Sequence, residues 1–117
     1  MEHSPLISII INCFNGERFL REAIDSVIAQ TYSNWELIFW DNQSTDSTAN
    51  IVRSYHDDRI RYFYAPEHTS LGEARNLALE KANGVYIGFL DSDDKWLPSF
   101  LSEYVGVIRE NPSAVLI

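Results

Sequence analysis

The feature that most constrains the fold of this chain is its alternation of short apolar runs with longer amphipathic stretches. Residues 6–11 are β-branched and almost wholly apolar, which is typical of a strand buried on both faces of a sheet. Between such runs, apolar residues recur at the three- and four-residue spacing of helices. We predict strands at residues 6–11, 35–40, 60–64 and 85–90, a fifth beginning at residue 114, and helices at residues 19–28, 48–55, 70–82 and 98–108.

This alternation predicts an α/β fold with a mainly parallel sheet, right-handed crossovers and helices on both faces. We expect the strand order 3-2-1-4. Ser70 and Glu73 have the spacing of a capping box at the start of the third helix, and Gly84 suits a left-handed helix end. Pro98 suits the first turn of the last helix. In such sheets ligands bind beyond the carboxyl ends of the strands, so the residues that follow each strand are the candidates for a site.

Length and charge narrow the class of protein. A chain of 117 residues suits one domain, and 45% apolar residues are enough for a packed core. The net charge of -8 argues against a nucleic-acid partner, because such proteins need a basic face. A single cysteine, Cys13, with no signal peptide or membrane-spanning run, leads us to expect a location in the cytoplasm or at the cytoplasmic face of a membrane. The chain ends within an apolar run, so we interpret it as a truncated domain.

The acidic cluster Asp91, Ser92, Asp93 and Asp94 follows the fourth predicted strand directly. Neighbouring carboxylates repel one another, and a bound cation relieves the repulsion. Oxygen ligands of this kind suit Mg²⁺ or Mn²⁺, which also accept phosphate oxygens. The alternative is an acidic helix start favoured by the helix dipole, and the cluster alone does not decide between the two.

Three further groups follow strands or open a helix. Asp41 and Asn42 follow the second strand, where a carboxylate could bind a base or ribose, although a loop cap is the simpler reading. Phe14 ends the first strand within residues 12–15 and could stack on a base or join the core. Arg75, near the start of the third helix, could bind a diphosphate bidentately or pair with a neighbouring glutamate.

Taken in order, four segments resemble the family-2 glycosyltransferases of the Rossmann-like GT-A fold. They are LISIIINCFN at residues 6–15, WDNQSTD at 40–46, ARNLA at 74–78 and GFLDSDD at 88–94. The resemblance extends from about residue 5 to residue 117 and is far more specific than any one motif. It implies that residues 1–117 are a single truncated domain, the donor-binding half of an inverting glycosyltransferase, without the acceptor-binding half.

The resemblance implies a donor that is a nucleoside diphosphate sugar, with Mn²⁺ or Mg²⁺ as cofactor. Asp93, with Asp91, would hold the metal, and Asp91 and Ser92 would lie near the ribose side of the donor. Arg75 would lie near the diphosphate. The base and donor would be bordered by Asn12, Phe14, Asn15, Asp41 and Asn42. Asn12, Cys13, Asn42 and Gln43 depart from the commoner family residues, and no residue after Asp94 matches the family's catalytic base.

The alternatives come from other classes. A phospho-receiver domain needs carboxylates after strand one and a late lysine, and neither is present. A dinucleotide oxidoreductase needs a glycine fingerprint that is absent after strand one. A non-catalytic nucleotide-binding or regulatory α/β module remains an alternative. As partners we expect the nucleotide sugar, an acceptor that is a saccharide, a lipid or a protein, and a homodimer formed through an exposed sheet edge.

Overall fold

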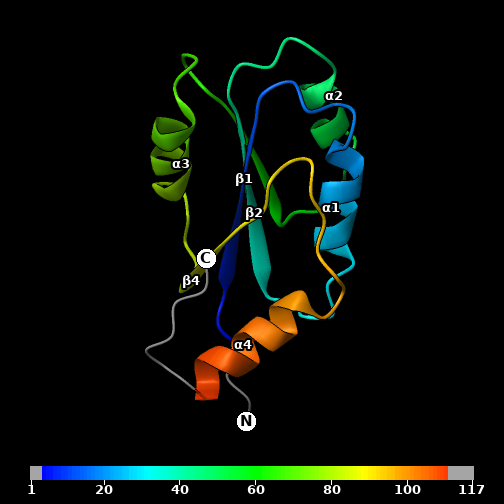
Figure 1. The fold of residues 1–117 in the computed structure, drawn as a ribbon, viewed down its shortest axis with the longest axis vertical. Helices are drawn as coiled ribbons and strands as arrows, with labels where there is room; N and C mark the ends of the chain where they lie inside the picture. Colours follow the sequence, from blue (N-terminus) through cyan, green and yellow to red (C-terminus); the bar gives the residue numbers. More distant parts are fainter. Residues whose placement is uncertain (1–3, 111–117) are drawn as a thin grey trace.

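A computed structural model describes residues 4–110 of the chain. Strands and helices alternate throughout this range, as the sequence predicts (Figure 1). The strands are β1 (Ile7–Cys13), β2 (Trp35–Asp41), β3 (Ile60–Tyr64) and β4 (Tyr86–Phe89), and the helices are α1 (Leu20–Ile28), α2 (Thr48–Arg53), α3 (Leu71–Leu79) and α4 (Phe100–Glu110). The fifth strand predicted from residue 114 lies outside the described residues.

The four strands form one parallel sheet in the order β3-β2-β1-β4, which confirms the predicted order. β1 and β2 pair along their full length, from Ile7 opposite Trp35 to Cys13 opposite Asp41. β4 is shorter and pairs only with the first part of β1, so it ends opposite Ile10. The residue pairing therefore puts the loop after β4 beside the last residues of β1, near the point where the strand order reverses.

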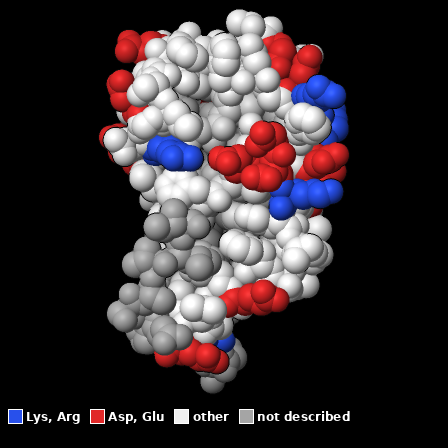
Figure 2. Space-filling view, in the orientation of Figure 1, with Lys and Arg blue, Asp and Glu red and all other residues white. Residues whose placement is uncertain are grey.

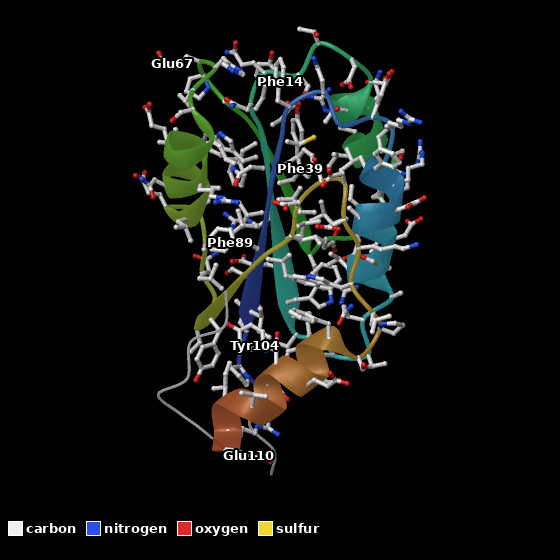
Figure 3. The ribbon with its side chains drawn as sticks, viewed as in Figure 1. Phe14, Phe39, Glu67, Phe89, Tyr104 and Glu110 are labelled. Carbon is white, nitrogen blue, oxygen red and sulfur yellow. The ribbon has the colours of Figure 1, made fainter. Side chains whose placement is uncertain are left out.

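Helices cover both faces of the sheet, and two separate hydrophobic clusters result. On one face, Ile7, Ile9 and Ile11 pack with α1, α2 and α4. On the other face, Ile10 packs with Ala74 and Ala78 of α3. Figure 1 shows α3 on one side of the strands, α1 and α2 on the other, and α4 across their amino ends. Phe39 of β2 points toward α1 and belongs to the first cluster (Figure 3).

A buried carboxylate of β2, that of Glu36, ties the turn between α3 and β4 to the amino end of the sheet. Glu36 accepts hydrogen bonds from the Ser8 hydroxyl and the Asn83 backbone N–H, both at 2.6 Å, and from Arg61 Nη1 at 3.1 Å. Burial by itself raises the pKa of the Glu36 carboxyl, but these hydrogen bonds and the Arg61 charge outweigh it and hold the pKa below its usual value. The network fixes the start of β4 against β1 and β2.

The structure corrects two details of the predicted helix ends. α3 ends at Leu79, and its cap is Glu80, whereas we predicted that the helix runs to residue 82 and that Gly84 forms a left-handed cap. Gly84 has no positive φ. Its lack of a side chain matters for another reason, because a Cβ there would lie 2.5 Å from Ser8 Oγ. α4 begins at Phe100, so Pro98 precedes the helix instead of lying in its first turn.

Candidate functional site

The loops that follow β1 and β4 border an open cavity of about 600 Å³ at the carboxyl edge of the sheet. Aromatic and aliphatic side chains line one part of it, and carboxylates line another. The lining residues are Asn12, Phe14, Asn15, Gly16, Arg18, Phe19, Leu71, Asp91, Ser92 and Asp93. Six of the residues predicted from the sequence therefore lie around one cavity, namely Asn12, Phe14, Asn15, Asp91, Ser92 and Asp93.

The loop after β1 is fastened to the loop after β2. Asn15 has a left-handed backbone, with φ of 54°, and its Oδ1 accepts hydrogen bonds from the Thr45 N–H at 2.7 Å and the Asp46 N–H at 3.3 Å. The Gly16 N–H donates to Thr48 Oγ1 at 3.0 Å. Asn15 thus borders the cavity while its side-chain oxygen holds the neighbouring loop, a role that the sequence analysis missed.

Phe14 stands at the end of β1 with half of its surface exposed, near the top of Figure 3. The His68 ring meets it edge-on, with the two centroids 4.7 Å apart. His68 Nδ1 also lies 2.9 Å from the Asn42 carbonyl oxygen, which fixes the ring. His68 is exposed and supports Phe14, and no sequence spacing indicates this contact because the two residues come from different loops.

Asp41 and Asn42 also lie at the carboxyl edge of the sheet, and both are buried. The two carboxylate oxygens of Asp41 accept hydrogen bonds from the Ser44 N–H at 2.8 Å and the Tyr62 hydroxyl at 2.6 Å. The Asn42 side chain pairs with the backbone of Thr69, donating at 2.9 Å and accepting at 3.0 Å. Neither residue lines the cavity, and both hold the loops that do.

Asn12 occupies the last part of β1 and lines the cavity. Its amide nitrogen Nδ2 is buried and has no hydrogen-bond partner among residues 4–110. An unpaired buried donor costs free energy, and a ligand oxygen would satisfy it. Asn12 is therefore a candidate donor to a bound molecule.

Asp91 and Asp93 of the acidic cluster line the other wall of the cavity. Asp91, Asp93 and Asp94 are exposed, and one carboxylate oxygen from each lies within 4.8 Å of the others. Figure 2 shows acidic side chains gathered near the middle of this face, over the loop between β4 and α4. Three carboxylates this close attract a cation, and their oxygens are the ligands that Mg²⁺ and Mn²⁺ prefer.

Arg75 faces the acidic cluster from the first turns of α3. Ser70 caps this helix by accepting a hydrogen bond from the Glu73 N–H, as the capping box predicts. One guanidinium nitrogen of Arg75 lies 3.9 Å from Asp91 Oδ1, and the group lies over the Phe89 ring at 5.6 Å. Within the described part of the chain, Arg75 forms an ion pair with Asp91 and not with Glu73 or Glu80. Both partners are exposed, so this contact is weak and leaves the guanidinium available.

Ser92 links the acidic loop to the end of β1. A Cβ on Gly16 would lie 2.5 Å from Cys13 Sγ and 3.3 Å from Ser92 Oγ, so the loops approach closely at this point. Burial raises the pKa of the Cys13 thiol, and hydrogen bonds with Ser92 and Thr48 offset only part of the rise. Cys13 is thus held as a neutral packing residue, because a reactive cysteine needs a lowered pKa.

With this geometry established, comparisons with known proteins identify the family. The profile of glycosyl transferase family 2 matches residues 8–117. A relative from Escherichia coli, UDP-Glc:alpha-D-GlcNAc-diphosphoundecaprenol beta-1,3-glucosyltransferase WfgD, is 39% identical over 106 residues, which are 91% of this chain and 42% of the relative.

Two solved structures share the fold. Staphylococcus aureus TarS 1–349 in complex with UDP-GlcNAc matches with a TM-score of 0.86 and 28% identity over 91% of this chain and 32% of that one. The mannosyltransferase PcManGT from Pyrobaculum calidifontis, in complex with GDP-Man and Mn²⁺, matches with a TM-score of 0.84 and 26% identity over 91% of this chain and 33% of that one.

These likenesses confirm the predicted fold and family. The parallel sheet in the order 3-2-1-4 has the GT-A fold of these transferases. The chain spans less than half the length of the relatives it matches. This chain belongs to glycosyl transferase family 2.

Proposed function

We propose that this chain is the donor-binding half of an inverting glycosyltransferase, which transfers a sugar from a nucleoside diphosphate to an acceptor. The observation that carries the proposal is the cavity that joins an exposed aromatic ring, Phe14, to the exposed carboxylates of Asp91 and Asp93, with Asp94 and Arg75 beside them. A ring suits a base, and a metal with an arginine suits a diphosphate. The nucleotide sugars bound by TarS and PcManGT support the assignment.

The divalent metal, Mn²⁺ or Mg²⁺, would be held by Asp93 and Asp91. The donor set fits, because carboxylate oxygens that lie within 4.8 Å of one another can share one ion. When bound, the metal neutralises charge on the diphosphate leaving group. Asp94 is the third member of the cluster and adds negative charge that attracts the ion.

The other residues of the cavity would bind and orient the donor. Arg75 would contact the diphosphate, since a guanidinium can donate two hydrogen bonds to phosphate oxygens without losing its proton. Phe14 would stack on the base, and the unpaired Asn12 amide would donate to a carbonyl or hydroxyl of the nucleoside. Ser92 would lie beside the ribose with Asp91. Asp41, Asn42 and Asn15 would shape the base side of the site through the loops that they hold.

Transfer with inversion also needs a base that removes the proton of the acceptor hydroxyl on the face opposite the leaving group. We assign no residue of this chain to that role. Glu103 lies on α4 and accepts a hydrogen bond from Ser99 Oγ at 2.9 Å, at the far end of the sheet from the cavity. We propose that the base and the acceptor site lie in the part of the relatives that this chain does not span.

The acceptor would be a saccharide, a lipid or a protein. The relative WfgD, by its name, acts on a sugar carried by diphosphoundecaprenol, which favours a lipid-linked saccharide and a site of action at the cytoplasmic face of a membrane. No helix among residues 4–110 has the length and apolar character needed to cross a membrane. Pairing of a sheet edge with a second copy would give a homodimer.

A thermal-shift screen tests the proposal. The chain is heated with UDP, GDP and other nucleoside diphosphates, each with Mn²⁺ or with a chelator. A ligand at 100 times its Kd stabilises the folded state by about 2.7 kcal/mol, so we expect at least one nucleoside diphosphate to raise Tm clearly in the presence of Mn²⁺. Unchanged Tm values with the whole panel at millimolar concentration would contradict donor binding.

A further inference from the structure

Two polar residues of the α1 segment fasten the far end of the loop between β4 and α4. Gln30 follows α1 and is 7% exposed. Its Nε2 donates to the Leu97 carbonyl at 2.7 Å, and its Oε1 accepts from the Leu101 N–H at 2.9 Å. In the last turn of α1, Ser26 Oγ accepts from the Trp96 N–H at 3.1 Å. The neighbouring Thr31 donates to the Pro98 carbonyl, from its backbone N–H at 2.9 Å and from its hydroxyl at 3.4 Å. The side chains of Gln30 and Ser26 therefore contribute three of the hydrogen bonds that hold this end of the loop.

The near end of the same loop is fastened to β1. The Leu90 N–H donates to the Ile10 carbonyl at 3.0 Å, and Ser92 packs against the position where Gly16 approaches. The three carboxylates of the acidic cluster stand between these two attachments. The later part of the loop runs beside α1, as Figure 1 shows.

The carboxylate groups of the acidic cluster make few contacts that could fix their positions. Within residues 4–110, the side chains of Asp91, Asp93 and Asp94 make one polar contact, the 3.9 Å ion pair between Asp91 and Arg75. All three side chains are exposed. Their mutual distances therefore depend on the loop backbone, and the backbone depends on its attachments at either end.

We propose that Gln30 and Ser26 are positioning residues for the metal site, which hold the loop so that its carboxylates meet at one ion. The inference rests on the proposed function, since it requires a metal at the acidic cluster. Mg²⁺ and Mn²⁺ need ligand oxygens close to ideal positions, at about 2.0–2.2 Å. A side chain that carries both a donor and an acceptor is needed at Gln30, because the Leu97 carbonyl and the Leu101 N–H would otherwise be left unpaired.

The experiment compares Mn²⁺ binding in three forms of the protein by calorimetry, at a temperature where each is fully folded. Gln30→Met keeps the length of the side chain and removes its hydrogen bonds to Leu97 and Leu101, together with a bond to the Ser26 carbonyl. Ser26→Ala removes the bond to Trp96 and a bond to the Ala23 carbonyl within α1. Residues that orient metal ligands change affinity by about 10–100-fold, so we expect Gln30→Met to weaken Mn²⁺ binding at least about tenfold and Ser26→Ala to weaken it less. The electron paramagnetic resonance spectrum of bound Mn²⁺ should have a different line width in each variant than in the wild type.

The matched control is Glu36→Gln, which breaks a buried network near the opposite end of the sheet. We expect it to lower Tm while the Kd for Mn²⁺ stays at the wild-type value. A wild-type protein that binds no Mn²⁺ would overturn the proposed function itself. Wild-type binding that is unchanged in folded Gln30→Met and Ser26→Ala would overturn the positioning role alone. If Gln30→Met does not fold, Ser26→Ala decides, and wild-type Kd and spectrum in that variant contradict the inference.

Discussion

Aspartates at the carboxyl edge of the sheet differ in their surroundings, and this difference separates structural from ligand-binding roles. Asp41 is fully buried and accepts hydrogen bonds on both oxygens. Asp93 is exposed and lines the cavity. A buried, paired carboxylate stabilises the fold, whereas an exposed one among like charges is available to a cation.

For Asp93, we predict that substitution by alanine abolishes the effect of Mn²⁺ on nucleoside diphosphate binding. The change removes a proposed ligand and one of the charges that attract the ion. Calorimetric titration with UDP and GDP, with and without Mn²⁺, measures this. Asp58→Ala removes the same charge from an exposed turn away from the cavity and should keep the Mn²⁺ effect. An Mn²⁺ effect that persists in Asp93→Ala would assign the ion to other ligands.

For Glu36, we predict a pH-dependent loss of stability on substitution by glutamine. Because the folded-state pKa lies below the usual 4.5, the ionised carboxylate contributes stability above that pH, and the contribution is lost as the pH falls through the folded-state value. Hydrogen bonds to a charged group contribute about 1.5–3 kcal/mol, so Glu36→Gln should lower the free energy of unfolding by about that amount at pH 7.

Urea denaturation of both proteins at a series of pH values between 7 and 3 checks this prediction. The wild-type and Glu36→Gln curves should converge as the pH falls through the folded-state pKa of Glu36. The pKa values of Asp46 and Asp57 are also lowered, but they affect both proteins alike. A constant difference across the series would mean that the Glu36 charge does not stabilise the fold.

The candidate site was only partly predictable at the level of single residues. Asp91 and Asp93 follow a strand directly, so the topology alone placed them at the edge, and the structure puts both in the cavity wall. Asp41 also follows a strand, but its burial depends on Tyr62, a residue of the next strand. Sequence spacing does not report such a partner, and neither does it report the contact between His68 and Phe14.

At the scale of elements, the start of α3 carries the cation that faces the acidic loop. We predict that Arg75→Ala weakens binding of a nucleoside diphosphate more than binding of the nucleoside. A charge-assisted contact is worth about 1.5–3 kcal/mol where it is desolvated, which is roughly a 10–100-fold loss in affinity. Lys81→Ala, which removes the same charge just beyond the other end of α3, should change neither affinity. Equal losses for both ligands in Arg75→Ala would indicate a role in folding.

Hydrophobic periodicity predicted all four described strands and all four helices, because burial of one face leaves its spacing in the sequence. The ends of the helices were less predictable. The predicted last turn of α3 is absent because the chain turns at Glu80 to bring the Asn83 N–H to Glu36 and the Gly84 N–H to Ser8. These are contacts between segments far apart in the sequence, and local propensity does not contain them.

At the scale of the whole molecule, the chain contains the proposed donor site and spans less than half the length of its relatives. We predict that it binds donor but does not transfer sugar at a useful rate. A missing general base alone costs about 10²–10⁴-fold, and the loss of acceptor positioning costs more. Slow hydrolysis of the donor could persist, since water needs no acceptor site.

This prediction is checked by incubating the purified chain with nucleotide sugars, Mn²⁺ and candidate acceptors, in parallel with a full-length relative. Transfer by the chain at a rate near that of the longer protein would mean that a base lies within these residues. Asp94 and Glu103 would then be the first residues to substitute.

The central claim is that the cavity at the carboxyl edge of the sheet binds a nucleoside diphosphate through a divalent metal. Isothermal titration of the unmodified chain with UDP and with GDP, once with Mn²⁺ and once with a chelator, tests it most directly. We predict that Mn²⁺ tightens the binding of at least one of them about tenfold or more, which corresponds to about 1.4 kcal/mol. Identical affinities with and without Mn²⁺, or no binding in either case, would contradict the account.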